Sequence, residues 1–166
     1  MYLSKNFTLK EMTSSNVGIR LGIDNSPTTE GIRKLTILAN SLLQPIRNDI
    51  GPLRITSAFR NEAINQALGG SVNSQHCRYE AADVQYFKDG KMDNLKIYES
   101  IINNCIEFDQ LILEFGEGCT EFTDSSNPYW IHLSYKIADN RNQVLVAYKD
   151  ENNKTKYRKP IEYKSL

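Results

Sequence analysis

Apolar residues recur every three to four positions in one long stretch of the first third of the chain, which places them on one face of a helix. The set comprises Ile32, Leu35, Leu38, Ala39, Leu42, Ile46 and Ile50. A helix should therefore begin at Thr28 or Thr29. Pro45 is expected to kink this helix, and Gly51 with Pro52 should end it.

The rest of the chain contains shorter periodic segments. A short helix is expected from Leu9, because Thr8 and Glu11 have the spacing of a capping box. Further helices are expected over residues 61–68 and 94–105, and strands over 53–57, 81–87, 108–115, 130–135 and 144–148. Helices come first and most strands later, which favours an α+β fold. We expect a small, mainly antiparallel sheet with the N-terminal helices packed on it.

The length of 166 residues suits one compact domain, which we assign to residues 1–148. Residues 149–166 are charged and poor in aliphatic side chains, so we expect a polar C-terminal tail that forms either a peripheral hairpin or a mobile end.

The overall charge argues against a polyanionic partner. The chain has 20 basic and 20 acidic residues, so no nucleic-acid partner is expected. The amino terminus lacks the apolar core of a secretory signal and no stretch is apolar enough to span a membrane. We therefore expect cytoplasmic synthesis without membrane insertion. A neutral surface with scattered aromatic residues fits a monomer or a dimer equally well.

Three cysteines at no recurring spacing indicate reduced thiols rather than a disulfide framework. Cys77 adjoins His76 and is interpreted as a bystander, since adjacent residues seldom point at one metal ion.

The chain has only two histidines, His76 and His132, and both have unusual neighbours. Asp83 follows His76 by seven positions, after two alanines that would allow close backbone packing. On the strand predicted at 130–135, Trp130, His132 and Ser134 share one face. Two imidazoles and one carboxylate form a ligand set that suits zinc and leaves a fourth position open for water. A purely structural zinc site is the alternative.

Hydrolysis at such a site needs a general base, for which Glu114 is the preferred candidate. It lies within the apolar segment FDQLILEFG, where a carboxylate is unusual unless it is functional or paired in a salt bridge. Asp109, near the start of the same strand, is interpreted as a structural hydrogen-bond acceptor. Arg60 follows a predicted strand, where its guanidinium could hold a substrate carboxylate or support an oxyanion, or could simply be solvated.

The ordered blocks FTLKEMTSS, LGIDNSP, LLQPIRNDIG, ITSAFR, NQALGGSVNSQH, EAAD, FDQLILEFG and WIHLSY resemble the zinc D-alanyl-D-alanine carboxypeptidases and the related wall peptidases of phage endolysins. The resemblance runs from about Phe7 to Arg141. It implies a fold like that of Hedgehog and the DD-peptidases and a zinc peptidase domain over residues 1–148.

Carried over by position, the resemblance implies that His76, Asp83 and His132 bind zinc. It also implies that Arg60 belongs to the site, as a catalytic and substrate-binding residue. Substrate contacts are further expected from Ser74, Gln75 and Trp130. The implied substrate is the stem peptide of peptidoglycan, cleaved by a D,D-carboxypeptidase or by an endolysin-type endopeptidase. Such a hydrolase would act at the cell wall after release, or within a phage particle.

The sequence departs from the family pattern at two positions. Many members have glycine where this chain has Tyr79, so the loop before the EAAD block is expected to differ. Several branches have an acidic base three residues before the last histidine, where this chain has Tyr129. Glu114 is the expected replacement. A catalytically inactive module that keeps the zinc site and binds wall peptide, for instance as a phage structural module, is the alternative function.

Overall fold

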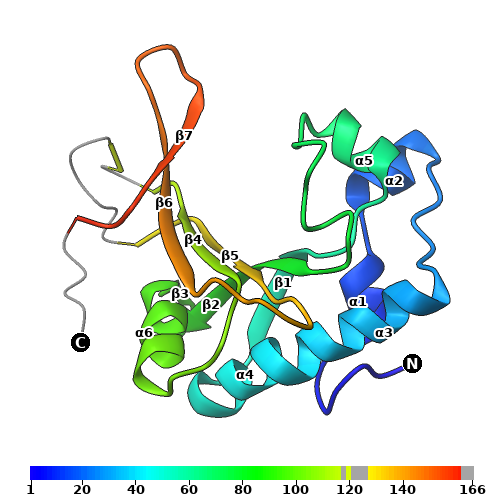
Figure 1. Ribbon diagram of the computed structural model, residues 1–166, viewed down its shortest axis with the longest axis horizontal. Helices are drawn as coiled ribbons and strands as arrows, with labels where there is room; N and C mark the ends of the chain where they lie inside the picture. Colours follow the sequence, from blue (N-terminus) through cyan, green and yellow to red (C-terminus); the bar gives the residue numbers. More distant parts are fainter. Residues whose placement is uncertain (117–118, 121–126, 162–166) are drawn as a thin grey trace.

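The computed structural model describes residues 1–116, 119–120 and 127–161, and they form an α+β fold built on a mixed sheet (Figure 1). The strands are β1 (Leu53–Ser57), β2 (Ala81–Lys88), β3 (Lys91–Met92), β4 (Gln110–Glu114), β5 (Trp130–Ser134), β6 (Gln143–Lys149) and β7 (Thr155–Arg158). Their order is β1-β2-β5-β4-β6-β7, and β3 pairs with the end of β2. All pairs are antiparallel except β4 with β6. The α+β class and the mainly antiparallel sheet are therefore confirmed.

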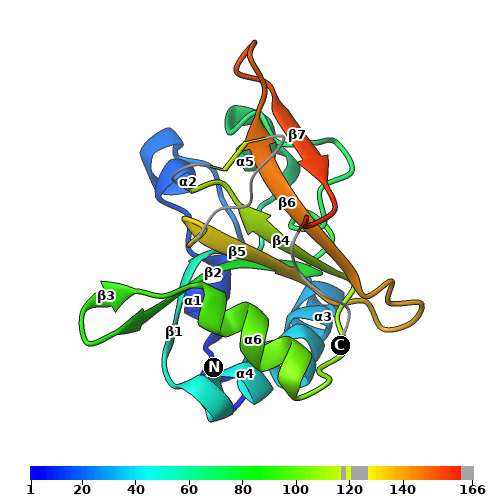
Figure 2. The ribbon, with the colours of Figure 1, turned by 90° about the vertical axis from the view of Figure 1, so that its left-hand side faces the viewer.

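The helices are α1 (Leu9–Thr13), α2 (Asn16–Leu21), α3 (Thr29–Leu38), η1 (Ala39–Leu43), α4 (Gln44–Ile50), α5 (Glu62–Ala67) and α6 (Leu95–Asn103). Figures 1 and 2 show α3, α4 and α6 on one side of the sheet, while α5 and the β6–β7 hairpin rise on the other. The core lies between the sheet and the first group of helices. It contains Leu35, Leu42, Ile46, Ile101, Leu111 and Ile131, which are all buried.

The predicted helix starts are confirmed by their caps. The Thr8 hydroxyl accepts a hydrogen bond from the Glu11 amide at 3.2 Å, and the Thr28 hydroxyl accepts one from the Gly31 amide at 3.0 Å. The interruption expected at Pro45 takes the form of a π-helical turn, η1, directly before α4. Proline has no amide hydrogen to donate to the preceding turn, so the regular helical ladder cannot continue through it.

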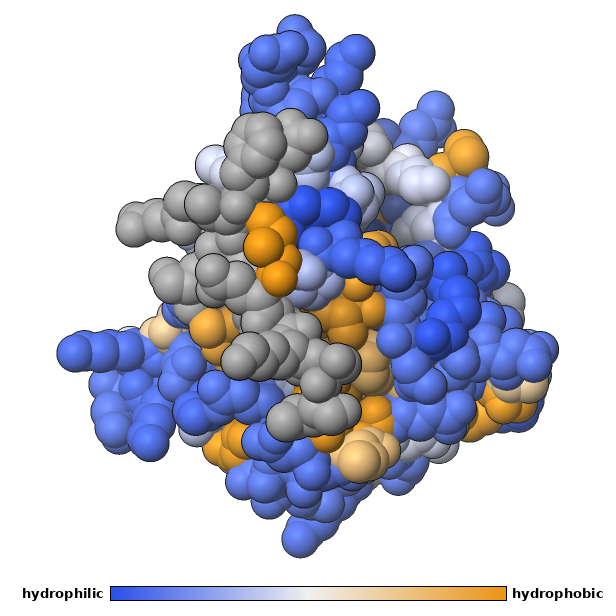
Figure 3. Space-filling view, turned by 60° about the vertical axis from the view of Figure 1, so that its left-hand side comes forward, coloured by the Kyte–Doolittle hydropathy of each residue, from blue (hydrophilic) through white to orange (hydrophobic). Residues whose placement is uncertain are grey.

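Two further features concern the surface and the tail. Of the two alternatives for the C-terminal tail, the structure has the hairpin, in which β7 pairs with β6 and ends at Arg158. Residues 162–166 lie outside the described residues. On the face drawn in Figure 3, hydrophilic side chains predominate and apolar ones form small separate patches. Among the described residues, Cys77, Cys105 and Cys119 form no disulfide. Within the described ranges, no helix is both long and apolar enough to cross a membrane.

Candidate metal centre

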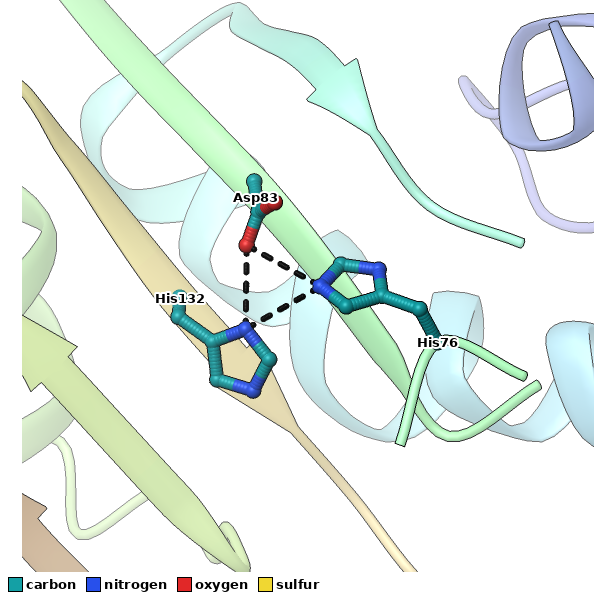
Figure 4. A group of neighbouring side chains, drawn as sticks. All are labelled: His76, Asp83 and His132. Carbon is teal, nitrogen blue, oxygen red and sulfur yellow. Dashed lines mark hydrogen bonds and ion pairs between the residues drawn. The ribbon is translucent and has the colours of Figure 1, made fainter. Parts of the chain in front are cut away.

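Asp83 and His132 are brought together by the pairing of two central strands. In the antiparallel register of β2 with β5, these residues are direct partners. Directly opposite residues of a sheet project from the same face. The His132 Nδ1 atom consequently lies 2.9 Å from the Asp83 Oδ1 atom (Figure 4).

His76 reaches this pair from the loop between α5 and β2. Its Nε2 atom lies 3.2 Å from His132 Nδ1 and 3.2 Å from Asp83 Oδ1. Its Nδ1–H group donates a hydrogen bond of 2.6 Å to the Ala58 carbonyl, which can only accept. This bond leaves the Nε2 lone pair directed at the other two groups, as a backbone acceptor does for metal-binding histidines.

The spacing of these three atoms tests whether the residues present suit a metal ion. Tetrahedral zinc with bonds of about 2.0 to 2.1 Å separates its ligand atoms by about 3.3 to 3.4 Å. The observed separations of 2.9 to 3.2 Å form a slightly contracted version of one face of that tetrahedron. Two nitrogens and one carboxylate oxygen are also donors that zinc accepts. His76, Asp83 and His132 therefore fit a divalent metal, as expected from the sequence.

Electrostatics at the centre favour an ionised carboxylate. Burial alone would raise the pKa of Asp83, but the two histidines oppose it through charge and hydrogen bonds, and together they hold that pKa far below its usual range. A carboxylate that stays ionised next to two imidazoles is the state that binds a cation.

The metal-binding group opens into a cleft of about 460 Å³ on the side of the sheet away from the helical core. Ile112, Glu114 and His132 belong to the strands that form its floor. One wall is the α5 segment with the loop that follows it, lined by Arg60, Leu68, Ser74 and Gln75. Phe115 directly after β4, Trp130 at the start of β5, and Thr155 and Tyr157 of β7 also line the cleft. The predicted site residues therefore all line one cleft.

Among the described residues that line this cleft, Glu114 is the one carboxylate besides Asp83. Its side chain is buried, and burial raises its pKa to about 7, with a further contribution from the charge of Asp83. The positive charges of His132, Arg60 and Lys149 oppose this shift. Among the described residues, none forms an ion pair with Glu114. The alternative of a carboxylate paired in a salt bridge therefore finds no support in this part of the chain.

A family model described as Peptidase M15 matches residues 5–111. The chain belongs to the Peptidase M15 family. The family is one of metal-dependent peptidases, and this M15 domain carries the His–Asp–His group such an enzyme needs. The matched segment contains Arg60, His76 and Asp83 and ends before Glu114 and His132. No curated protein matches the chain.

Arg60 occupies a partly buried position on the wall of the M15 cleft. Its Nη2 atom lies 4.0 Å from Asp83 Oδ2, and only 17% of its side chain is exposed. Its Nε atom is buried and has no hydrogen-bond partner among the described residues. The solvated alternative is therefore wrong, because the guanidinium is held largely buried beside Asp83.

Gln75 is engaged in the support of the loop that carries His76. Its amide donates a hydrogen bond of 2.7 Å to Asp109, which is fully buried. Asp109 also pairs with Arg141 and Lys136. Burial would raise the pKa of Asp109, but hydrogen bonds from Arg141, Gln75 and Lys136 outweigh it and keep that pKa low. Asp109 is thus the structural acceptor expected from the sequence, and through Gln75 it anchors the metal-binding loop.

Tyr79 occupies a backbone conformation that favours glycine. Its φ of 62° lies in the left-handed region, which a residue with a β-carbon seldom adopts. The ring stacks on Phe59 with centroids 4.0 Å apart, and the hydroxyl accepts a hydrogen bond from the Thr28 amide at 3.3 Å. It also packs on Gly31, where a β-carbon would approach the ring to 2.4 Å. These contacts offset the strain of the backbone.

Tyr129 lies outside the cleft, with 45% of its surface exposed, immediately before β5. Sequence reasoning did not identify the contribution of β7 to the cleft, which is lined by Thr155 and Tyr157. The available signal was the alternation of Thr155 and Tyr157, which places both on one face of a strand.

Proposed function

We propose that this chain is a zinc-dependent metallopeptidase that cleaves peptide bonds in the stem peptides of bacterial peptidoglycan. The observation that carries the proposal is the convergence of His76, Asp83 and His132 to separations of 2.9–3.2 Å, with Glu114 in the same cleft. The family membership supports peptidase chemistry. We also assign the fold to the Hedgehog and DD-peptidase type on the resemblance of the sequence blocks.

His76, Asp83 and His132 would hold the zinc ion. When bound, the ion would supply Lewis-acid chemistry, polarising the scissile carbonyl and making a water molecule easier to deprotonate.

Glu114 is assigned the proton transfers. A base works best when its pKa lies near the working pH, and burial raises the pKa of Glu114 to about 7. Its carboxylate would take a proton from the attacking water and return it to the leaving amine. Zinc would lower this pKa, because a nearby cation favours the ionised carboxylate.

Arg60 and the cleft walls are assigned the binding of the substrate. The guanidinium fork of Arg60 lines the cleft and suits a peptide carbonyl or a terminal carboxylate. Ser74 and Trp130 also line the cleft and would contact the peptide. Gln75 would contribute through the loop that it anchors on Asp109.

We further propose that the protein is made in the cytoplasm and meets its substrate at the cell wall after release, or as part of a phage particle. A bacterial source would favour the first route, and a phage source the second.

The proposal is tested by incubating the zinc-loaded protein with purified peptidoglycan and identifying the released fragments by mass spectrometry. Glu114→Gln, a chelated sample and the exposed-site control Glu151→Gln run beside it. New termini are expected with wild type and Glu151→Gln alone, while Glu114→Gln keeps its zinc. Free D-alanine would identify a carboxypeptidase, and larger fragments an endopeptidase.

The same experiment also tests the competing function. If the zinc-loaded wild type binds peptidoglycan without cleaving it, the protein is a wall-binding module rather than a peptidase. The supporting observation for this function is that position 129 holds a tyrosine instead of an acidic residue.

A further inference from the structure

The β6–β7 hairpin places one more reactive side chain in the cleft. Trp130 pairs with Glu114 across β5 and β4, Glu114 with Ala147 across β4 and β6, and Ala147 with Tyr157 across β6 and β7. Residues paired in this way project from the same face of a sheet. Tyr157 therefore points to the face that carries Glu114 and the metal-binding group, and it lines the same cleft.

Ala147 makes this arrangement possible. It is fully buried and stands between Glu114 and Tyr157 in the row. Strands β4 and β7 are two strand spacings apart, about 9 to 10 Å. A larger side chain at Ala147 would fill the space above β6, whereas a methyl group leaves the two long side chains room to approach each other over the floor of the cleft.

The charges around Tyr157, which is 54% exposed, favour the protonated form of its hydroxyl. Burial raises the pKa of Tyr157, and the negative charges of Glu114 and Asp83 raise it further. The hydroxyl therefore stays protonated at neutral pH and acts as a hydrogen-bond donor rather than as a base.

We propose that Tyr157 is a further catalytic residue, whose hydroxyl donates a hydrogen bond to the scissile carbonyl oxygen as that oxygen gains negative charge. The inference rests on the proposed peptidase function. Donors positioned where charge develops in the transition state accelerate the reaction without tightening substrate binding to the same degree. Tyr157 belongs to the hairpin that follows residue 111, beyond the segment matched by the family model, so the match assigns it no role.

Tyr157→Phe in the full zinc-loaded chain tests the hydroxyl alone. We expect kcat on the cleaved peptide to fall by about 10- to 100-fold, with KM changed less than threefold and zinc content and Tm unchanged. The matched control is Tyr148→Phe, which removes a hydroxyl from the same hairpin on the opposite face, next to Ala147. The control should keep kcat within twofold. A Tyr157→Phe variant that also does so would overturn the proposal.

A second measurement separates this inference from the proposed function. A phosphinate analogue of D-alanyl-D-alanine carries its negative oxygen where the transition state does, so Tyr157→Phe should weaken its binding by about 10- to 100-fold. Tyr148→Phe should leave that affinity unchanged. If the wild type cleaves no peptide, the peptidase proposal fails while the phosphinate comparison still decides the role of Tyr157. Equal affinities for wild type and Tyr157→Phe, or no phosphinate binding by the wild type, overturn it.

Discussion

Replacing Glu114 by Gln in the metal-free protein should remove a pH-dependent destabilisation whose size follows from the burial of the carboxyl group. Burial raises the pKa of Glu114 from 4.5 to about 7, so the folded state holds this proton more tightly than the unfolded chain does. Stability from this group is complete below pH 4.5 and is lost as the pH rises through 7. At about 1.36 kcal/mol per unit of pKa, the loss reaches about 3 kcal/mol near pH 8.

The assay is urea or thermal unfolding of chelated wild type and Glu114→Gln between pH 4.5 and 8. Chelation matters because a bound cation would lower the pKa of Glu114 and would itself stabilise the folded state. Relative to wild type, Glu114→Gln should gain about 3 kcal/mol across this range, or roughly 5 to 10 °C in Tm. Contributions from Asp83 and Asp109 are common to both proteins and largely cancel in the difference.

The control Glu151→Gln removes a carboxylate from the exposed turn between β6 and β7 and should give a flat difference across the pH range. A Glu114→Gln difference that changes by less than about 1 kcal/mol between pH 4.5 and 8 would refute the reasoning. It would mean that water solvates the carboxylate of Glu114 in the metal-free cleft, so that burial could not tune it as a base.

Three further outcomes are expected. His76→Ala should lower zinc affinity by at least 100-fold in a competition titration with a chromophoric chelator, because one of three ligands is lost; unchanged affinity would place the metal elsewhere. Gly31→Ala should destabilise the protein by about 1 to 3 kcal/mol in urea unfolding, because its β-carbon would meet the Tyr79 ring at 2.4 Å, and adding Tyr79→Gly should recover part of the loss. Asp109→Ala should lower the free energy of unfolding by about 3 to 5 kcal/mol at pH 7, because it leaves buried donors unpaired. This loss should shrink as the pH falls and the wild-type carboxylate is protonated. A loss that does not depend on pH would contradict this ion-pair assignment.

Elements governed by local chemistry were predictable from the sequence. The caps at Thr8 and Thr28 and the apolar periodicity of α3 act within a few residues, so their signals are visible in the chain itself. Helix α2 has only six residues and was not predicted, because its single turn and a half depends on the Ser15 cap and the left-handed Gly22 rather than on an apolar stripe.

Features that depend on distant partners were not predictable. Strands β3 and β7 are two and four residues long, and each exists through pairing with a longer neighbour. The charged composition of the tail left a peripheral hairpin and a mobile end as alternatives, and only the structure shows that residues of β7 reach the cleft. The parallel pairing of β4 with β6 likewise depends on the path of the intervening chain, which no local pattern encodes.

The site residues divide in the same way. The scarcity of histidine made His76 and His132 conspicuous, and a carboxylate in an apolar strand did so for Glu114. Gln75 was expected to contact substrate. In the structure its side-chain amide donates a hydrogen bond to Asp109, and spacing along the chain cannot reveal a contact between residues 34 positions apart. Tyr79 was noticed only as a departure from the family pattern, whereas its stacking on Phe59 is a contact that spacing cannot reveal.

These supports decide how rigidly the metal-binding group is held. Asp83 and His132 are cross-strand partners at the centre of the sheet, so their backbones stay opposite each other unless β2 and β5 separate. His76 comes from a loop, and its position depends on three anchors: the Gln75 bond to Asp109, the Ala58 carbonyl and the stacked ring of Tyr79. Loss of an anchor should therefore weaken zinc binding before it unfolds the domain, whereas damage to the central strands should do both together. The sheet thus sets two ligands of the site, and the packing of one loop sets the third.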